Sequence, residues 1–238
     1  MVDLDVRSRT LAICFSGVAG FVDVVGFLAT GGFFVSFMSG NSTRLGIGFA
    51  EQSSTALVAG GLILTFVAGV VAGASVGRVA GRFKETAILM LVTLLLALAL
   101  VVQWRGLVGP AVIPLALAMG AQNTVFAEDG DVRVGLTYMT GTLVKLGKRI
   151  TASLWGGPPF GWVWFLALWS GLLLGAILGG ICYARFGSSA LVVPVLMVLF
   201  SDGRLCRSTA ERRPGCASLG SICDIGSRPK SRRCSGLR

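Results

Sequence analysis

An acidic side chain in the middle of an apolar run is the feature of this sequence that most suggests chemistry. Asp23 lies about thirteen residues into the first apolar segment and is the only acidic residue inside any predicted membrane span. A carboxylate there is costly, so it should face a polar interior or a partner charge. One interpretation is that Asp23 binds a proton or a cation. The other is a structural ion pair with Arg44 or Lys145, the cations available within the apolar region.

Two short polar stretches add amide and hydroxyl groups to this set. The stretches MSGN (residues 38–41) and MTGT (139–142) combine a glycine with polar side chains, which keep backbone groups hydrogen-bonded where a helix breaks in lipid. A broken helix also turns N–H or C=O groups toward a cavity, where they can bind an ion or the charged end of a solute. Each stretch is therefore a structural break alone or part of a binding site. The expected polar lining is Asp23, Asn41, Gln122, Asn123, Ser39 and Thr140, with Arg44 and Lys145 as charge partners.

Enzyme chemistry finds little support in the sequence. The chain has no histidine, which excludes a Ser-His-Asp triad and a His-based metal site. The glycine-rich stretches lack the G-x(4)-G-K-[ST] order of a phosphate loop. Four of the six cysteines follow residue 200, at spacings that do not match the paired cysteines of zinc sites. We expect no enzyme activity, no metal and no cofactor.

The segments that carry the polar residues occur twice. FMSGNSTRLG (residues 37–46) matches YMTGTLVKLG (138–147), and Gly20 and Asp23 align with Gly120 and Asn123. This order predicts two tandem repeats, at about 11–103 and 109–200. Glycines spaced by four also recur about 102 residues apart, and small residues of this kind let membrane helices approach closely. They are interpreted as packing positions, with a sliding surface between repeats as the alternative: Gly69, Gly73, Gly77, Gly171, Gly175 and Gly179.

The composition places these segments in a bilayer. The chain of 238 residues is 54% apolar and 13% charged, with a mean hydropathy of +0.80, which indicates an integral membrane protein. A span needs about 20 apolar residues. Predicted spans cover residues 11–29, 56–77, 86–103, 109–127 and 161–183, and a shorter sixth begins near residue 188.

Two interrupted segments, 33–50 and 134–155, decide the topology. Eight spans would put 7 Lys/Arg inside and 5 outside, whereas six spans with two broken or re-entrant helices would put 9 inside and 3 outside. The positive-inside rule favours the second arrangement with a cytoplasmic N-terminus. We then expect Arg82, Lys84, Lys148 and Arg149 on the cytoplasmic side and Arg105 and Arg185 on the periplasmic side. Three spans per repeat make the repeats inverted, as in many secondary transporters.

The net charge of +10 does not predict a nucleic-acid partner. Residues 201–238 hold 9 Lys/Arg against 3 Asp/Glu, and the basic residues before them flank spans, where they set topology and contact anionic lipid. Residues 1–200 are expected to form a single membrane domain. The tail, 201–238, has too few apolar residues for a core and is expected to be disordered. It is interpreted as the product of a frameshift or as a basic cytoplasmic tail.

Four stretches resemble the signature of a known family. They are GFVDVVGF (20–27), FVSFMSGNSTRLG (34–46), MGAQNTVF (119–126) and TYMTGTLVKLG (137–147), and they are similar to those of the YoaK-like bacterial multi-pass membrane proteins, whose function is unknown. The resemblance covers about residues 11–200 and implies an all-α, polytopic protein of the inner membrane. Beside it, the repeat pattern favours a small-solute or ion transporter with a polar central site, and a non-transporting scaffold or regulatory subunit is the alternative. Expected partners are the lipid bilayer, a small solute or cation, and a second copy of the chain.

Overall fold

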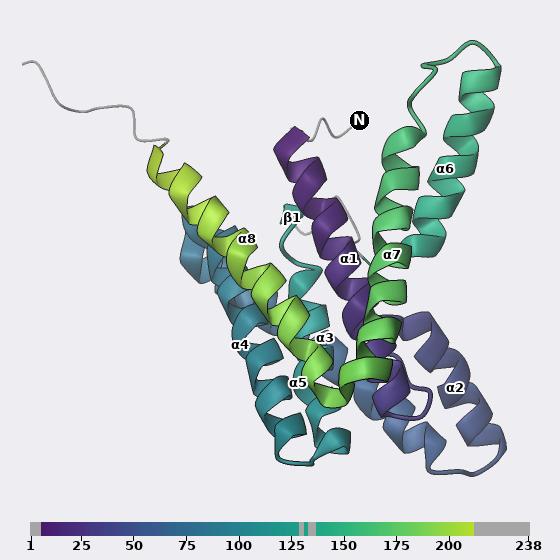
Figure 1. The fold of residues 1–238 in the computed structure, drawn as a ribbon. Coiled ribbons are helices and arrows are strands. Elements are labelled where there is room, and N and C mark those ends of the chain that lie inside the picture. Colours follow the sequence, from purple (N-terminus) through teal and green to yellow (C-terminus); the bar gives the residue numbers. More distant parts are fainter. Residues whose placement is uncertain (1–5, 129–130, 133–136, 212–238) are drawn as a thin grey trace, which may run out of the picture.

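The protein is built almost entirely of helices in its computed structural model, which describes residues 6–128, 131–132 and 137–211 (Figure 1). The predicted all-α class is confirmed. The helices are α1 (Val6–Ala29), α2 (Met38–Ala50), α3 (Thr55–Ala80), α4 (Lys84–Trp104), α5 (Val108–Gln122), α6 (Met139–Leu154), α7 (Val163–Phe186) and α8 (Val192–Glu211). Short 3-10 turns, η1 (Gly81–Phe83) and η2 (Gly187–Leu191), precede α4 and α8. After α5, β1 (Ala127–Glu128) and β2 (Asp131–Val132) form a two-residue antiparallel pair.

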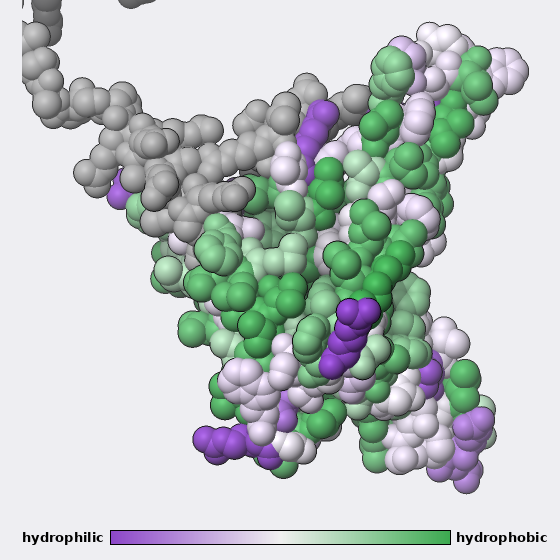
Figure 2. Space-filling view, in the orientation of Figure 1, coloured by the Kyte–Doolittle hydropathy of each residue, from purple (hydrophilic) through white to green (hydrophobic). Residues whose placement is uncertain are grey.

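The outer surface of the helices is apolar, as expected for contact with lipid. Large side chains such as Val79 (92% exposed), Trp155 (85%) and Leu57 (81%) lie on the outside, and green, hydrophobic residues dominate the face in Figure 2. Soluble proteins rarely expose apolar patches of this extent. Three helical stretches are long and apolar enough to cross a membrane, namely Arg9–Ala29, Thr55–Trp104 and Val163–Ser201, and Val108–Gln122 is a shorter apolar helix. The protein therefore spans the bilayer.

Two of these stretches contain a turn at a glycine. An unbroken helix of 50 residues would be about 75 Å long, well beyond a bilayer's thickness. Gly81 (φ 53°) and Gly187 (φ 54°) instead adopt left-handed backbone angles, at which a side chain would be strained. Their N–H groups donate to Gly77 O and Tyr183 O and cap α3 and α7. The chain reverses after each glycine, so α3 with α4, and α7 with α8, run in opposite directions (Figure 1).

The closest helix contact joins α1 to α7, the seventh helix along the chain. Gly171 packs on Ile13, Gly175 on Gly17 and Gly179 on Phe21. Residue numbers rise together along both helices, so α1 and α7 are parallel. Backbone meets backbone here because these positions of α7 carry no side chain.

A second parallel contact joins α3 to α5. Gly69 packs on Leu117, and a Cβ at Gly73 would lie 2.8 Å from the Cα of Ala121. In Figure 1, α1 and α7 run downward while α3 and α5 run upward, and the α2–α3 and α6–α7 hairpins point away from the body at opposite ends.

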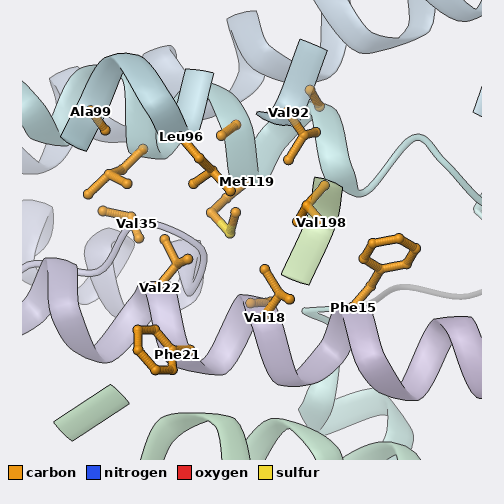
Figure 3. Close-up of a cluster of buried hydrophobic side chains, with 14 of the residues drawn as sticks. Phe15, Val18, Phe21, Val22, Val35, Val92, Leu96, Ala99, Met119 and Val198 are labelled. Carbon is orange, nitrogen blue, oxygen red and sulfur yellow. The ribbon is translucent and has the colours of Figure 1, made fainter. Parts of the chain in front are cut away.

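The centre of the molecule is apolar. Phe15, Val18 and Val22 of α1 point toward side chains of α4, α5 and α8, and all are almost completely buried. Figure 3 shows Val92, Leu96, Met119 and Val198 completing this cluster. At the C-terminal end, α8 continues to Glu211, so the first residues of the predicted disordered tail are helical. The prediction of disorder for residues 212–238 falls outside the described residues.

Candidate functional site

The polar residues gather where the chain breaks between helices. The first break, residues 30–37, separates α1 from α2 and is called here the α1–α2 break. Gly31 (φ 69°) and Gly32 (φ 124°) take backbone angles that other residues rarely adopt, so α1 cannot continue past them. The Thr30 hydroxyl donates to Gly26 O at 2.8 Å and accepts the Phe33 N–H at 3.0 Å. This satisfies backbone groups that would otherwise be exposed to lipid.

Asp23 holds the far end of this break through the backbone. Its Oδ1 accepts the N–H groups of Val35 and Ser36, both at 2.8 Å. These residues lie immediately before α2, twelve and thirteen positions along the chain. Among the residues whose side chains are described, neither Arg44 nor Lys145 forms an ion pair with Asp23. The carboxylate therefore ties α1 to the start of α2.

Asn41 fixes the same break from the side of α2. It is completely buried, and its Oδ1 accepts the Phe34 N–H at 3.1 Å while its Nδ2 donates to Phe34 O at 2.7 Å. The side-chain amide thus pairs with one residue's backbone as a neighbouring strand would. Both polar groups of Phe34 are satisfied without water.

A second polar contact occurs between α5 and α6. Asn123 follows α5, and its Oδ1 accepts the hydroxyl of Thr137 at 3.2 Å while its Nδ2 donates to Met119 O at 2.9 Å. Thr137 lies just before α6, as Ser36 lies just before α2. At both places, therefore, a polar residue near the end of one helix bonds to the segment that precedes the next helix.

Gln122 serves a different contact. Its Nε2 donates to Phe15 O at 2.7 Å and so joins α5 to α1, and its buried Oε1 has no partner among the described residues. Ser39, Thr140 and Lys145 lie exposed on the outer sides of α2 and α6. Asp23, Asn41 and Arg44 meet at the α1–α2 break, whereas Gln122 and Asn123 belong to other contacts. The predicted residues thus occupy several places, and the central cluster between α1, α4, α5 and α8 is apolar.

Several contributors have no polar signature in the sequence. The partners of Asp23 are backbone groups, and no residue type marks a backbone N–H. Phe27 and Phe33, whose rings face Arg44, read as ordinary apolar residues.

Gln103 of α4 is 3% exposed, and within the described chain neither side-chain polar atom of Gln103 has a partner. It could have been noticed as an amide on the otherwise apolar face of Val92, Leu96 and Ala99.

The family described as "Protein of unknown function (DUF1275)" matches residues 11–201. A UPF0700 transmembrane protein of Rhizobium meliloti is 35% identical over 189 residues, which are 79% of this chain and 82% of the relative. The UPF0700 transmembrane protein YoaK of Bacillus subtilis is 29% identical over 150 residues, or 57% of this chain and 64% of the relative. No solved structure matches the chain significantly. The resemblance read from the four stretches is confirmed.

Proposed function

The chain belongs to this family of transmembrane proteins of unknown function, and we propose that it is a small-solute or ion transporter of inverted-repeat type, without enzyme activity. The observation that carries the proposal is a set of matched contacts between its halves. Gly20 of α1 lies against Leu172 and Ala176 of α7, and Gly120 of α5 lies against Phe66 and Val70 of α3. The two partners of Gly20 on α7 and the two partners of Gly120 on α3 are related by the same interval: Leu172 follows Phe66, and Ala176 follows Val70, by 106 residues. This supports two structural halves with the same internal plan and opposite directions.

The contacts also favour a different register for the repeat than the sequence did. Gly69 on Leu117 corresponds to Gly175 on Gly17, and not to Gly171 as the sequence alignment had it. Gly81 and Gly187, which cap α3 and α7, are separated by the same interval. A pattern of glycines every four residues aligns with itself equally well after a shift of four residues. The amino-acid sequence alone therefore could not define the register of the repeat. The proposed second repeat is therefore offset by one helical turn along α7.

Six spans and two non-crossing helices describe this arrangement best. The crossing helices would be α1, α3, α4, α5, α7 and α8, whose directions alternate along the chain (Figure 1). Arg9 of α1 lies over Trp164 at the start of α7, with 5.8 Å from its Cζ to the ring centroid. The α1–α7 pair and the α3–α5 pair run in opposite directions (Figure 1). The end of α3, with Arg78 and Arg82, therefore lies on the same side as Arg9. The larger number of cations there supports a cytoplasmic N-terminus in a bacterial inner membrane.

The breaks and the small-residue contacts suggest how such a protein would work. In inverted-repeat transporters one half rocks against the other around discontinuous helices. Here the α1–α7 and α3–α5 contacts are close and nearly free of side chains, so small movements would require little repacking. The α1–α2 break, held by Asp23 and Asn41, would supply the polar groups that a solute or ion meets.

Flux measurements test the proposal directly. Purified protein would be screened by thermal shift against ions and small metabolites, since a ligand of the folded state raises its apparent stability. Hits would then be loaded into proteoliposomes, and their movement compared with empty liposomes and with the Asp23→Asn variant. Ser75→Ala is the matched control, because Ser75 is exposed on α3 and bonds only within its helix, to Val71 O at 2.7 Å. Flux no greater than in empty liposomes for every hit would reject transport.

A membrane scaffold or regulatory subunit is the second candidate. It is favoured by the apolar cluster at the centre and by the way Asp23, Asn41 and Asn123 bond to nearby groups of the chain. A scaffold needs a protein partner and no solute. Co-purification of a stoichiometric partner, together with an empty ligand screen, would favour this second function.

A further inference from the structure

The guanidinium of Arg44 is a charged group held between two aromatic rings. It is half-buried on α2 and faces the α1–α2 break, where its Cζ lies 5.1 Å from the ring centroid of Phe33 and 5.9 Å from that of Phe27. The face of an aromatic ring attracts a cation, and the planar guanidinium group can stack on that face. Two rings from the end of α1 and from the break thus position one side chain.

Gly32 makes room for this group. A Cβ at Gly32 would lie 2.7 Å from one terminal nitrogen of Arg44 and 3.3 Å from the other. The φ of 124° at Gly32 already favours glycine. The same residue therefore takes part in the turn after α1 and leaves room for the guanidinium beside the backbone.

The donors of this guanidinium are not used within the described chain. Its contacts there are the two rings and the backbone of Gly32, with no carboxylate and no hydrogen-bond acceptor. Asp23, the acidic residue of the same region, has its Oδ1 occupied by the N–H groups of Val35 and Ser36. A guanidinium carries five N–H donors in a rigid fork that fits the two oxygens of a carboxylate or phosphate.

We infer that Arg44 is an oxyanion site, which takes a carboxylate or phosphate group at the α1–α2 break. The same chemistry comes from a soluble organic anion or from the headgroup of an anionic lipid. If the ligand is a soluble anion, the inference rests on the transport role proposed above and specifies the class of solute that is transported. It is tested by binding, so a protein that binds the anion without moving it would retain the site and lose only the transport role.

The experiment uses the full chain in nanodiscs of zwitterionic phosphatidylcholine. Thermal unfolding is followed as sodium phosphate or sodium acetate is added at constant ionic strength. We expect a saturable rise in Tm, of about 5–10 °C when the anion reaches 100-fold its Kd. Arg44→Gln should abolish the rise, and Arg44→Lys, which keeps the charge without the fork, should weaken binding at least tenfold. Arg105→Gln is the charge-matched control, since Arg105 is exposed in the α4–α5 turn.

A second arm distinguishes the two sources of the anion. In nanodiscs that contain phosphatidylglycerol, a headgroup ligand would raise the Tm of the wild type and of Arg105→Gln without any soluble anion, and would leave Arg44→Gln unchanged. If Arg44→Gln does not fold, the comparison of Arg44→Lys with the wild type decides. Equal responses of the Arg44 and Arg105 variants in both arms, or no response of the wild type in either, would overturn the inference.

Discussion

Asp23 shows how a buried acidic side chain in a membrane helix can serve the backbone. Its carboxylate is the acceptor for two N–H groups that the α1–α2 break leaves without helical partners. A hydrogen bond to a charged acceptor is stronger than one between neutral groups. This interaction explains why a costly residue can lie here without an ion pair to Arg44 or Lys145 among the described residues. Asn123, at the end of α5, accepts a single threonine hydroxyl, that of Thr137, and is a neutral residue.

Removal of the Asp23 side chain should destabilise the fold. Asp23→Ala would leave the N–H groups of Val35 and Ser36 without their acceptor, at a cost of about 1–3 kcal/mol for each. Asp23→Asn keeps one carbonyl oxygen in place and should cost clearly less. Thermal unfolding in detergent measures both, with Ser75→Ala as the control that should remain near wild type. Equal stability of Asp23→Ala and Ser75→Ala would show that the carboxylate does not hold the break.

The partners of single residues were the least predictable part of the molecule. The sequence identified Asp23, Asn41 and Asn123 as unusual, because a polar group in an apolar run stands out. It could not say that Asn41 would pair with the backbone of Phe34, since every residue offers the same backbone groups. A lining of a common cavity was therefore predicted from residues that the structure distributes over separate contacts.

Helices themselves were more predictable than their partners. The predicted segments 56–77 and 86–103 lie within α3 and α4, and 161–183 overlaps α7, which begins at Val163, because apolar length is a direct requirement of the bilayer. The segment 109–127 extends further than α5, which ends at Gln122. Beyond it, the N–H groups of Asn123 and Thr124 bond three residues back, to Gly120 O and Ala121 O, and tighten the chain into a turn. Hydropathy does not detect this change because Val125 and Phe126 are still apolar.

Two glycines of α7 give a matched test of the close helix contact. A Cβ at Gly175 would overlap the carbonyl oxygen of Gly17, so Gly175→Ala must push α1 and α7 apart, at about 1–3 kcal/mol or more. Gly180 has only Val24 within reach, at 3.6 Å, and Gly180→Ala should be neutral or stabilise by about 0.5–1 kcal/mol. Unfolding in detergent compares the two variants. Similar stabilities would mean that the α1–α7 contact is looser than described.

At the scale of the whole molecule, the ends of the bundle can be assigned by labelling. We expect a cysteine at position 82 to react from the cytoplasmic side and one at position 105 to react from the periplasmic side, because the two positions lie at opposite ends of α4. The measurement needs a background without the native cysteines, since Cys14 is exposed. Labelling of both positions from one side would exclude α4 as a crossing helix and, with it, the six-span arrangement.

The parallel contact between α1 and α7 has a consequence for how the chain is made. Gly17 leaves the ribosome 158 residues before Gly175, which at about 5–20 residues per second is roughly 8–30 s earlier. During that time the small-residue face of α1 lacks its α7 partner, and the contacts between residues 1–105 and 106–238 cannot all form. Each half depends on a helix of the other, so neither should survive quality control alone. We expect that residues 1–105 or 106–238 expressed separately are degraded, whereas co-expression restores both fragments as a complex, and pulse-chase analysis would follow this. A long-lived first half by itself would show that α1 finds another partner before α7 is synthesised.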